Sequence, residues 1–111
     1  MSALEQFHAV GSHIEDASKG NMFGYLNYKI GRKPFMFFDR ASENAIAFKL
    51  GEPQRSAALN LAGASVFNPG DKNRPMRNWI LVPFDHVARW EELALQSYEY
   101  VWREINKGGQ G

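Results

Sequence analysis

The apolar residues near the start of the chain follow a helical spacing. One narrow stripe recurs at intervals of three and four over residues 3–18, formed by Leu4, Phe7, Gly11 and Ile14. This pattern predicts a surface helix that lies on a core. Lys19 and Gly20 then supply a cation for the last turn and a residue that accepts a left-handed backbone, so we expect the helix to end there.

From Asn21 onward the apolar period changes to two, which predicts strands. Over residues 21–30, alternate positions share a face, and the short turn Gly31-Arg32 leads into a second extended segment. The run 35–38 is apolar at every position, as in a strand covered on both faces or lying at an interface. A third alternating segment covers 45–50, so the three strands form an antiparallel meander.

The second half of the chain alternates helical and extended patterns. Pro53 suits the first turn of a short helix that ends near Gly63, and strands follow over 65–67 and 78–82. Asp85 is placed to cap a last, long helix. The apolar positions of that helix are Val87, Trp90, Ala94, Tyr98, Val101 and Ile105.

The element order is therefore α-β-β-β-α-β-β-α. It predicts an α+β fold, a two-layer sandwich in which an antiparallel sheet of about five strands is covered chiefly by the terminal helices. A chain of 111 residues suits one core, so we expect a single domain over residues 1–107 and a disordered tail over 108–111.

Composition narrows the class of protein. The chain is 44% hydrophobic and 14% aromatic, which argues against intrinsic disorder, and its formal net charge of +1 gives no overall attraction to nucleic acid or anionic membranes. It has no cysteine, and its N-terminus lacks the apolar core of a signal peptide. We therefore expect a cytoplasmic protein that does not enter the membrane.

The titratable residues do not form a recognisable catalytic or metal-binding pattern. His8 and His13 are five residues apart on one helix and so point about 140° away from each other, while His86 stands alone. Glu91-Glu92 and Glu99 fit a solvated helix face, where Asp85 with Arg89 and Glu99 with Arg103 are spaced to pair. The motifs of hydrolases, zinc proteases, NTPases and Rossmann enzymes are missing from the sequence. We expect no enzymatic activity, no metal and no cofactor.

A cationic loop is the better candidate for a binding site. Lys72, Arg74 and Arg77 lie among asparagines and beside Trp79, a mixture of donors and an aromatic ring that suits phosphates and bases. The alternative is a solvated loop with internal salt bridges, which the balanced net charge favours. Trp79 is expected to pack under the C-terminal helix or to line a shallow groove. A small-ligand or acid/base site would need Trp79 and His86 in one pocket.

The chain also has more apolar surface than one core stripe requires. The run 35–38 is apolar on both faces, and Tyr98, Tyr100 and Trp102 lie on more than one side of the last helix. Self-association through the sheet or the last helix would cover this area, so a homodimer is one expectation. A second core layer inside the monomer is the other.

A series of short motifs resembles the TfoX N-terminal domain family, a relative of the YjbR-like proteins. The matching pieces, in order, are Met22-Phe23-Gly24, Gly31-Arg32-Lys33-Pro34-Phe35, Lys49-Leu50, Pro69, Pro75-Met76, Trp79, Val82-Pro83 and Trp90. They extend over roughly residues 20 to 103. Tyr25 stands where the family often has a second glycine.

The resemblance implies an α+β domain and a regulatory role rather than a chemical one. The family is named after a bacterial regulator of competence for DNA uptake, in which a second, helical domain follows this one. We therefore expect a stand-alone interaction or regulatory module, with a protein partner or a second copy as its target. A nucleic-acid-associated regulator is the alternative, since related proteins have been discussed as DNA-binding by analogy of fold.

Overall fold

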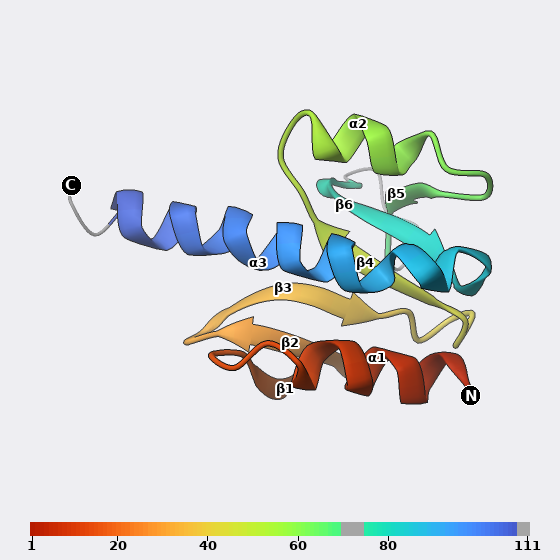
Figure 1. Ribbon diagram of the computed structural model, residues 1–111, viewed down its shortest axis with the longest axis horizontal. Coiled ribbons are helices and arrows are strands. Elements are labelled where there is room, and N and C mark those ends of the chain that lie inside the picture. The colour runs from red at the N-terminus through yellow and green to blue at the C-terminus, as the bar shows by residue number, and fades with distance from the viewer. Residues whose placement is uncertain (70–74, 109–111) are drawn as a thin grey trace.

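The computed structural model describes residues 1–69 and 75–108 and has the expected α+β architecture (Figure 1). One antiparallel sheet has the strand order β1-β2-β3-β4-β6-β5. The helices are α1 (Ala3–Ser12), α2 (Gln54–Leu59), the 3-10 turn η1 (Phe84–His86) and α3 (Val87–Gly108). The strands are β1 (Ser18–Met22), β2 (Tyr25–Ile30), β3 (Lys33–Phe38), β4 (Ala45–Lys49), β5 (Ser65–Phe67) and β6 (Met76–Pro83).

The main core lies between the helices and one face of the sheet. Alternate residues of the central strands, such as Ile46 and Phe48 of β4 and Ile80 of β6, point to this face and are fully buried. From the helices, Phe7 of α1 and Trp90 of α3 enter the same cluster, together with Ala58 of α2. In Figure 1, α1 and α3 run across this face of the sheet.

A β-bulge explains why the run 35–38 is apolar throughout. The register between β2 and β3 shifts at Tyr28/Lys29, so Lys29 faces Pro34 while Tyr28 faces Met36. Phe35 is the extra residue, and it joins Met36 in the helix-side core. The Phe35 ring meets Tyr98 of α3 at a centroid distance of 5.7 Å.

A second, smaller core lies on the opposite face of the sheet. It contains Phe37, Ala47, Phe67 and Trp79, with the Phe37 and Trp79 rings 4.8 Å apart. This cluster includes no residue of a helix. The prediction that Trp79 packs beneath the last helix is wrong, because Trp79 pairs with Lys49 and alternates with Ile80, which takes the helix side.

The N-terminal helix is shorter than the apolar spacing predicts, and a sixth strand follows it. A capping box, in which the Ser2 hydroxyl accepts from the Glu5 amide and Glu5 Oε1 accepts from the Ser2 amide, starts α1 at Ala3. The helix ends at Ser12, and residues 18–22 form β1 instead of a helix end. β1 is an edge strand with mostly exposed side chains, so it carries no apolar alternation to reveal it.

The buried stripe of α1 is also rotated from the predicted one. Phe7 and Gly11 are buried as expected, but Leu4 is exposed, and Ala3 and Val10 take the remaining core positions. Phe7 packs on Tyr28 of β2 and Phe38 of β3, with ring centroids 5.2 and 5.4 Å away. These contacts fix α1 over the first half of the sheet.

The start of α3 differs from the prediction as well. Asp85 lies inside η1, and no side chain caps that turn. Arg89 pairs with Glu92 rather than with Asp85, whereas the predicted pair of Glu99 and Arg103 is present at 3.6 Å. The helix extends to Gly108, one residue beyond the predicted domain end, and residues 109–111 lie outside the described part. Of the helices described, none has the length and apolar content needed to cross a membrane.

Candidate functional site

Only one of the three predicted loop cations lies in the described part of the chain. Lys72 and Arg74 fall outside it, and Arg77 is an exposed residue of β6. The Arg77 carbonyl accepts a hydrogen bond from Arg55 Nε at 2.6 Å, so the Arg55 guanidinium lies beside the backbone of Arg77. The proposed nucleic-acid site at Lys72, Arg74 and Arg77 remains a prediction.

Trp79 and His86 do not share a pocket. Trp79 belongs to the helix-free face, where it is 7% exposed. His86 lies in η1, and its Nε2 is 2.7 Å from the carbonyl oxygen of Ala62, while the neighbouring Phe84 packs on Trp90 on the helix side. An acid/base site that combines Trp79 and His86 is therefore not formed.

The other two histidines make contacts that hold elements together. His13 Nδ1 lies 2.5 Å from Glu91 Oε1, which links the end of α1 to α3. His8 Nδ1 lies 3.0 Å from the Tyr28 hydroxyl, which can also donate to the His8 carbonyl at 3.4 Å. Within residues 1–69 and 75–108, no group of three His, Asp or Glu side chains is arranged to hold a metal ion.

The partial burial of His8 makes stability depend on pH. Burial lowers the pKa of His8 below its ordinary value of 6.5, because the charged imidazole loses hydration, and the nearby charge of Lys19 acts in the same direction. The unfolded chain therefore takes up this proton at a higher pH than the folded chain. Neutral His8 therefore contributes fully to the free energy of unfolding above about pH 6.5. This contribution is lost as the pH falls below that value and through the lower pKa that His8 has in the folded state.

We expect a His8→Gln variant to lose less thermal stability than the wild type between about pH 7.5 and about pH 5.5. The comparison is made by circular dichroism melting of both proteins, so that the titration of shared carboxylates cancels. Equal losses of Tm in the two proteins would show that His8 does not contribute.

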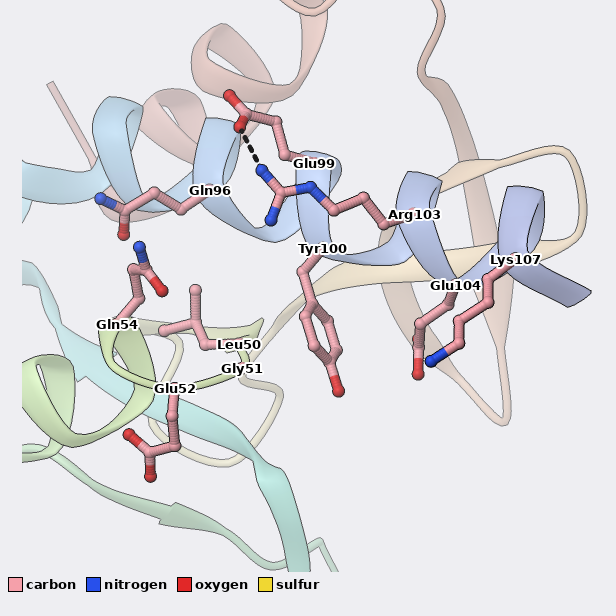
Figure 2. A pocket seen from close by; sticks show the side chains of 10 residues that line it. All are labelled: Leu50, Gly51, Glu52, Gln54, Gln96, Glu99, Tyr100, Arg103, Glu104 and Lys107. Atoms are coloured by element: carbon pink, nitrogen blue, oxygen red, sulfur yellow. Dashed lines mark ion pairs between the residues drawn. The ribbon is translucent and has the colours of Figure 1, made fainter.

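A hollow in the described surface lies beside the C-terminal half of α3. It has a volume of about 700 Å³ and is bounded on one side by α3 and on the other by the connection from β4 to α2. Figure 2 shows the side chains that line it, with the Tyr100 ring pointing from α3 toward that connection. We call this feature the α3 groove. Its lining residues are Leu50, Gly51, Glu52, Gln54, Gln96, Glu99, Tyr100, Arg103, Glu104 and Lys107.

Gly51 is what allows Tyr100 to lie where it does. A Cβ atom placed on Gly51 would come closer than 3.0 Å to two carbon atoms of the Tyr100 ring. The ring thus rests directly on the backbone that leaves β4. This close contact orients an aromatic side chain at the base of the α3 groove.

The charges of the α3 groove are paired but remain accessible to solvent. Glu99 pairs with Arg103 at 3.6 Å, and Glu52 pairs with Arg55 at 3.7 Å. Glu104 pairs at 3.1 Å with Lys49 at the end of β4. The three carboxylate side chains are 53%, 59% and 41% exposed, respectively, so these pairs can exchange with charges of a ligand.

The opposite flank of α3 carries two exposed apolar side chains. Leu95 and Trp102 are 49% and 48% exposed, and their spacing of seven residues places them on one side of the helix. Around the helix, Glu99 and Arg103 at the edge of the α3 groove separate this pair from Tyr100. Tyr98, by contrast, is partly buried, and its hydroxyl donates to Asp16 at 3.4 Å.

Sequence reasoning therefore located the surplus aromatic residues of the last helix but not the groove. Tyr100 is one of the aromatic residues predicted to provide more apolar surface than one core needs, and it lines the α3 groove. The opposite wall depends on how Leu50 and Gly51 leave β4, which no motif encodes. Gly51, two residues before Pro53, is the signal of a close backbone approach that the sequence offers.

Comparisons with known proteins identify no similar protein. No family model matches the chain, and neither a curated protein nor a solved structure shows significant similarity to it.

Proposed function

We propose that this protein is a small non-enzymatic interaction or regulatory module of the TfoX N-terminal type, which acts as a homodimer. Its recognition site is the α3 groove, and its ligand is an extended peptide segment of a partner protein. The observation that carries this proposal is the position of Tyr100, whose ring is held against Gly51 in the α3 groove.

The lining of the α3 groove suits a peptide better than a small apolar molecule. Seven of its ten residues carry charged or amide side chains, whereas pockets for small molecules are mostly apolar with few polar groups. An extended peptide would place backbone amides beside Gln54 and Gln96. A tyrosine in the centre is the residue type that often dominates the binding energy of such an interface.

The charges indicate which peptide side chain would bind next to Tyr100. The groove contributes three carboxylates and two cations, Arg103 and Lys107. A lysine or arginine of the peptide would stack on the Tyr100 ring and form ion pairs with the exposed carboxylates of Glu52 and Glu104. We therefore propose a segment with at least one basic residue.

Selection from a random peptide library tests the proposal. Peptides selected on the wild-type protein should contain a basic residue, and they should bind Tyr100→Ala at least about tenfold more weakly, because the central ring is lost. Trp102→Ala, which changes an exposed aromatic residue of the same helix outside the groove, is the matched control and should bind normally.

Peptides that bind wild type and Tyr100→Ala equally would overturn the groove as the recognition site. So would a selection that yields no binder. In both cases the folded state of each variant is checked by its circular dichroism spectrum.

The alternative function, a nucleic-acid-associated regulator, makes a different prediction. Binding through Lys72, Arg74 and Arg77 would weaken steeply as salt increases and would fall when these three residues are neutralised. We do not favour it, because the net charge of the chain is only +1, which gives no overall attraction to phosphates.

A further inference from the structure

The turn between β1 and β2 places an aromatic residue where the backbone least favours one. Met22 pairs with Tyr25, so Phe23 and Gly24 form a two-residue hairpin loop. Both have positive φ angles, 55° and 82°. Turns of this kind favour Asn, Asp or Gly at the first loop position, and a bulky residue there is strained.

Within the described residues, Phe23 makes too little contact to offset this strain. Its side chain is 91% exposed, the largest exposure among the large apolar residues of the described chain. Met22 beside it is 37% exposed. The turn itself is held by the Asn21 side chain, whose Oδ1 accepts from the Gly24 amide at 3.1 Å, so the ring projects from a fixed support.

A small pocket lies close to this turn on the helix-free face of the sheet. We call it the tip pocket; its volume is about 300 Å³, and its wall begins at Tyr25, two residues after Phe23. The rings of Tyr25 and Phe67 contact each other edge to face, with centroids 6.0 Å apart, and together give the pocket an aromatic wall. The described residues that line it are Tyr25, Asp39, Ala41, Ser65, Val66, Phe67, Asn68, Pro69 and Leu81.

We propose that Phe23 of each chain inserts into the tip pocket of a second copy, so that two chains form a symmetric dimer through their β1–β2 turns. This inference names the interface of the homodimer and rests on the self-association in the proposed function. The projecting Phe23 ring and the tip pocket lie close together on one chain. A two-fold axis near Tyr25 would bring the ring of each chain to the pocket of the other, which is the arrangement of an isologous contact.

The charged residues near the turn are held within their own chain. The Arg40 guanidinium lies against Gly24, since a Cβ there would come closer than 3.0 Å to Arg40 Nη1. Asp39 lines the tip pocket but is 6% exposed, and its carboxylate accepts from the Ser42 hydroxyl at 2.7 Å and from the Ser42 amide at 3.3 Å. The contact made by Phe23 is therefore apolar rather than ionic.

The contact is small, so the dimer should be weak. An aromatic side chain buries about 150–250 Å², and two of them with their pockets fall below the roughly 1,200 Å² of stable complexes. We expect a dimer that forms reversibly with rising protein concentration.

Sedimentation velocity over a concentration series up to about 1 mM tests the interface. Wild type should shift from monomer to dimer, and Phe23→Asn should weaken self-association at least about tenfold. Asparagine suits the first loop position, so this variant should keep or raise its Tm, which separates loss of the interface from loss of the fold. Ala41→Trp, at the exposed rim of the tip pocket, should also weaken the dimer because it blocks entry.

Control variants on α3 separate this inference from the function on which it rests. Leu95→Ala and Trp102→Ala should dimerise like wild type. A dimer lost in these variants and kept in Phe23→Asn would place the interface on α3, overturning the inference while keeping self-association. A wild type that stays monomeric throughout would overturn the inference and the proposed homodimer together, but not peptide binding in the α3 groove.

Discussion

Replacing Trp79 with alanine is expected to lower the free energy of unfolding by about 3–5 kcal/mol. The side chain is 7% exposed and packs against Phe37 in the core of the helix-free face. Alanine would leave a cavity that the neighbouring strands cannot close, because Phe37 and Trp79 lie on hydrogen-bonded central strands. Urea denaturation followed by circular dichroism measures the change.

A second tryptophan provides the matched control. Trp102 is 48% exposed on α3, so Trp102→Ala should cost less than about 1 kcal/mol. If Trp79→Ala were as mild as Trp102→Ala, Trp79 would be a groove residue rather than part of a second core.

Gly11→Ala is expected to destabilise the protein by about 1–3 kcal/mol, although alanine is the better helix former. A Cβ on Gly11 would lie closer than 3.0 Å to three carbon atoms of the Tyr28 ring. That ring cannot move aside freely, since it is buried and Phe7 packs on it. The steric cost therefore exceeds the gain of about 1 kcal/mol in helix propensity.

A double-mutant cycle identifies the cause of this loss. In a Tyr28→Leu background the smaller side chain makes room, so Gly11→Ala should cost clearly less than in the wild type. Equal costs in the two backgrounds would mean that contact with Tyr28 is not the reason for glycine at this position. Thermal and urea unfolding of the four proteins provide the data.

The fold class followed from the sequence because most elements bury one face. The alternation over 45–50 and the helical spacing in α3 each matched an element of the structure, and the terminal helices cover the sheet as expected. β1 was missed because an exposed edge strand is held by its backbone, which leaves no side-chain pattern. The side of the sheet on which Trp79 lies could not be predicted either. A period of two separates the residues of the two strand faces but does not show which face the helices cover.

The candidate sites were harder to predict, because they depend on contacts between distant segments. The α3 groove joins Gly51 to Tyr100, and the tip pocket joins Tyr25 to Phe67. Neither pair is close in sequence. Phe23 stood in a recognised motif, Met22-Phe23-Gly24, but only the backbone angles place it in a turn instead of at the start of a strand.

The most direct test of the proposed function is a nuclear magnetic resonance titration of the labelled protein with a selected basic peptide. If the α3 groove is the recognition site, the backbone amides of Gly51, Gln96, Tyr100 and Arg103 should shift in a saturable way, while that of Trp79 should not. Tyr100→Ala should abolish most of these shifts. Shifts confined to other surfaces, or none at saturating peptide, would contradict the proposal.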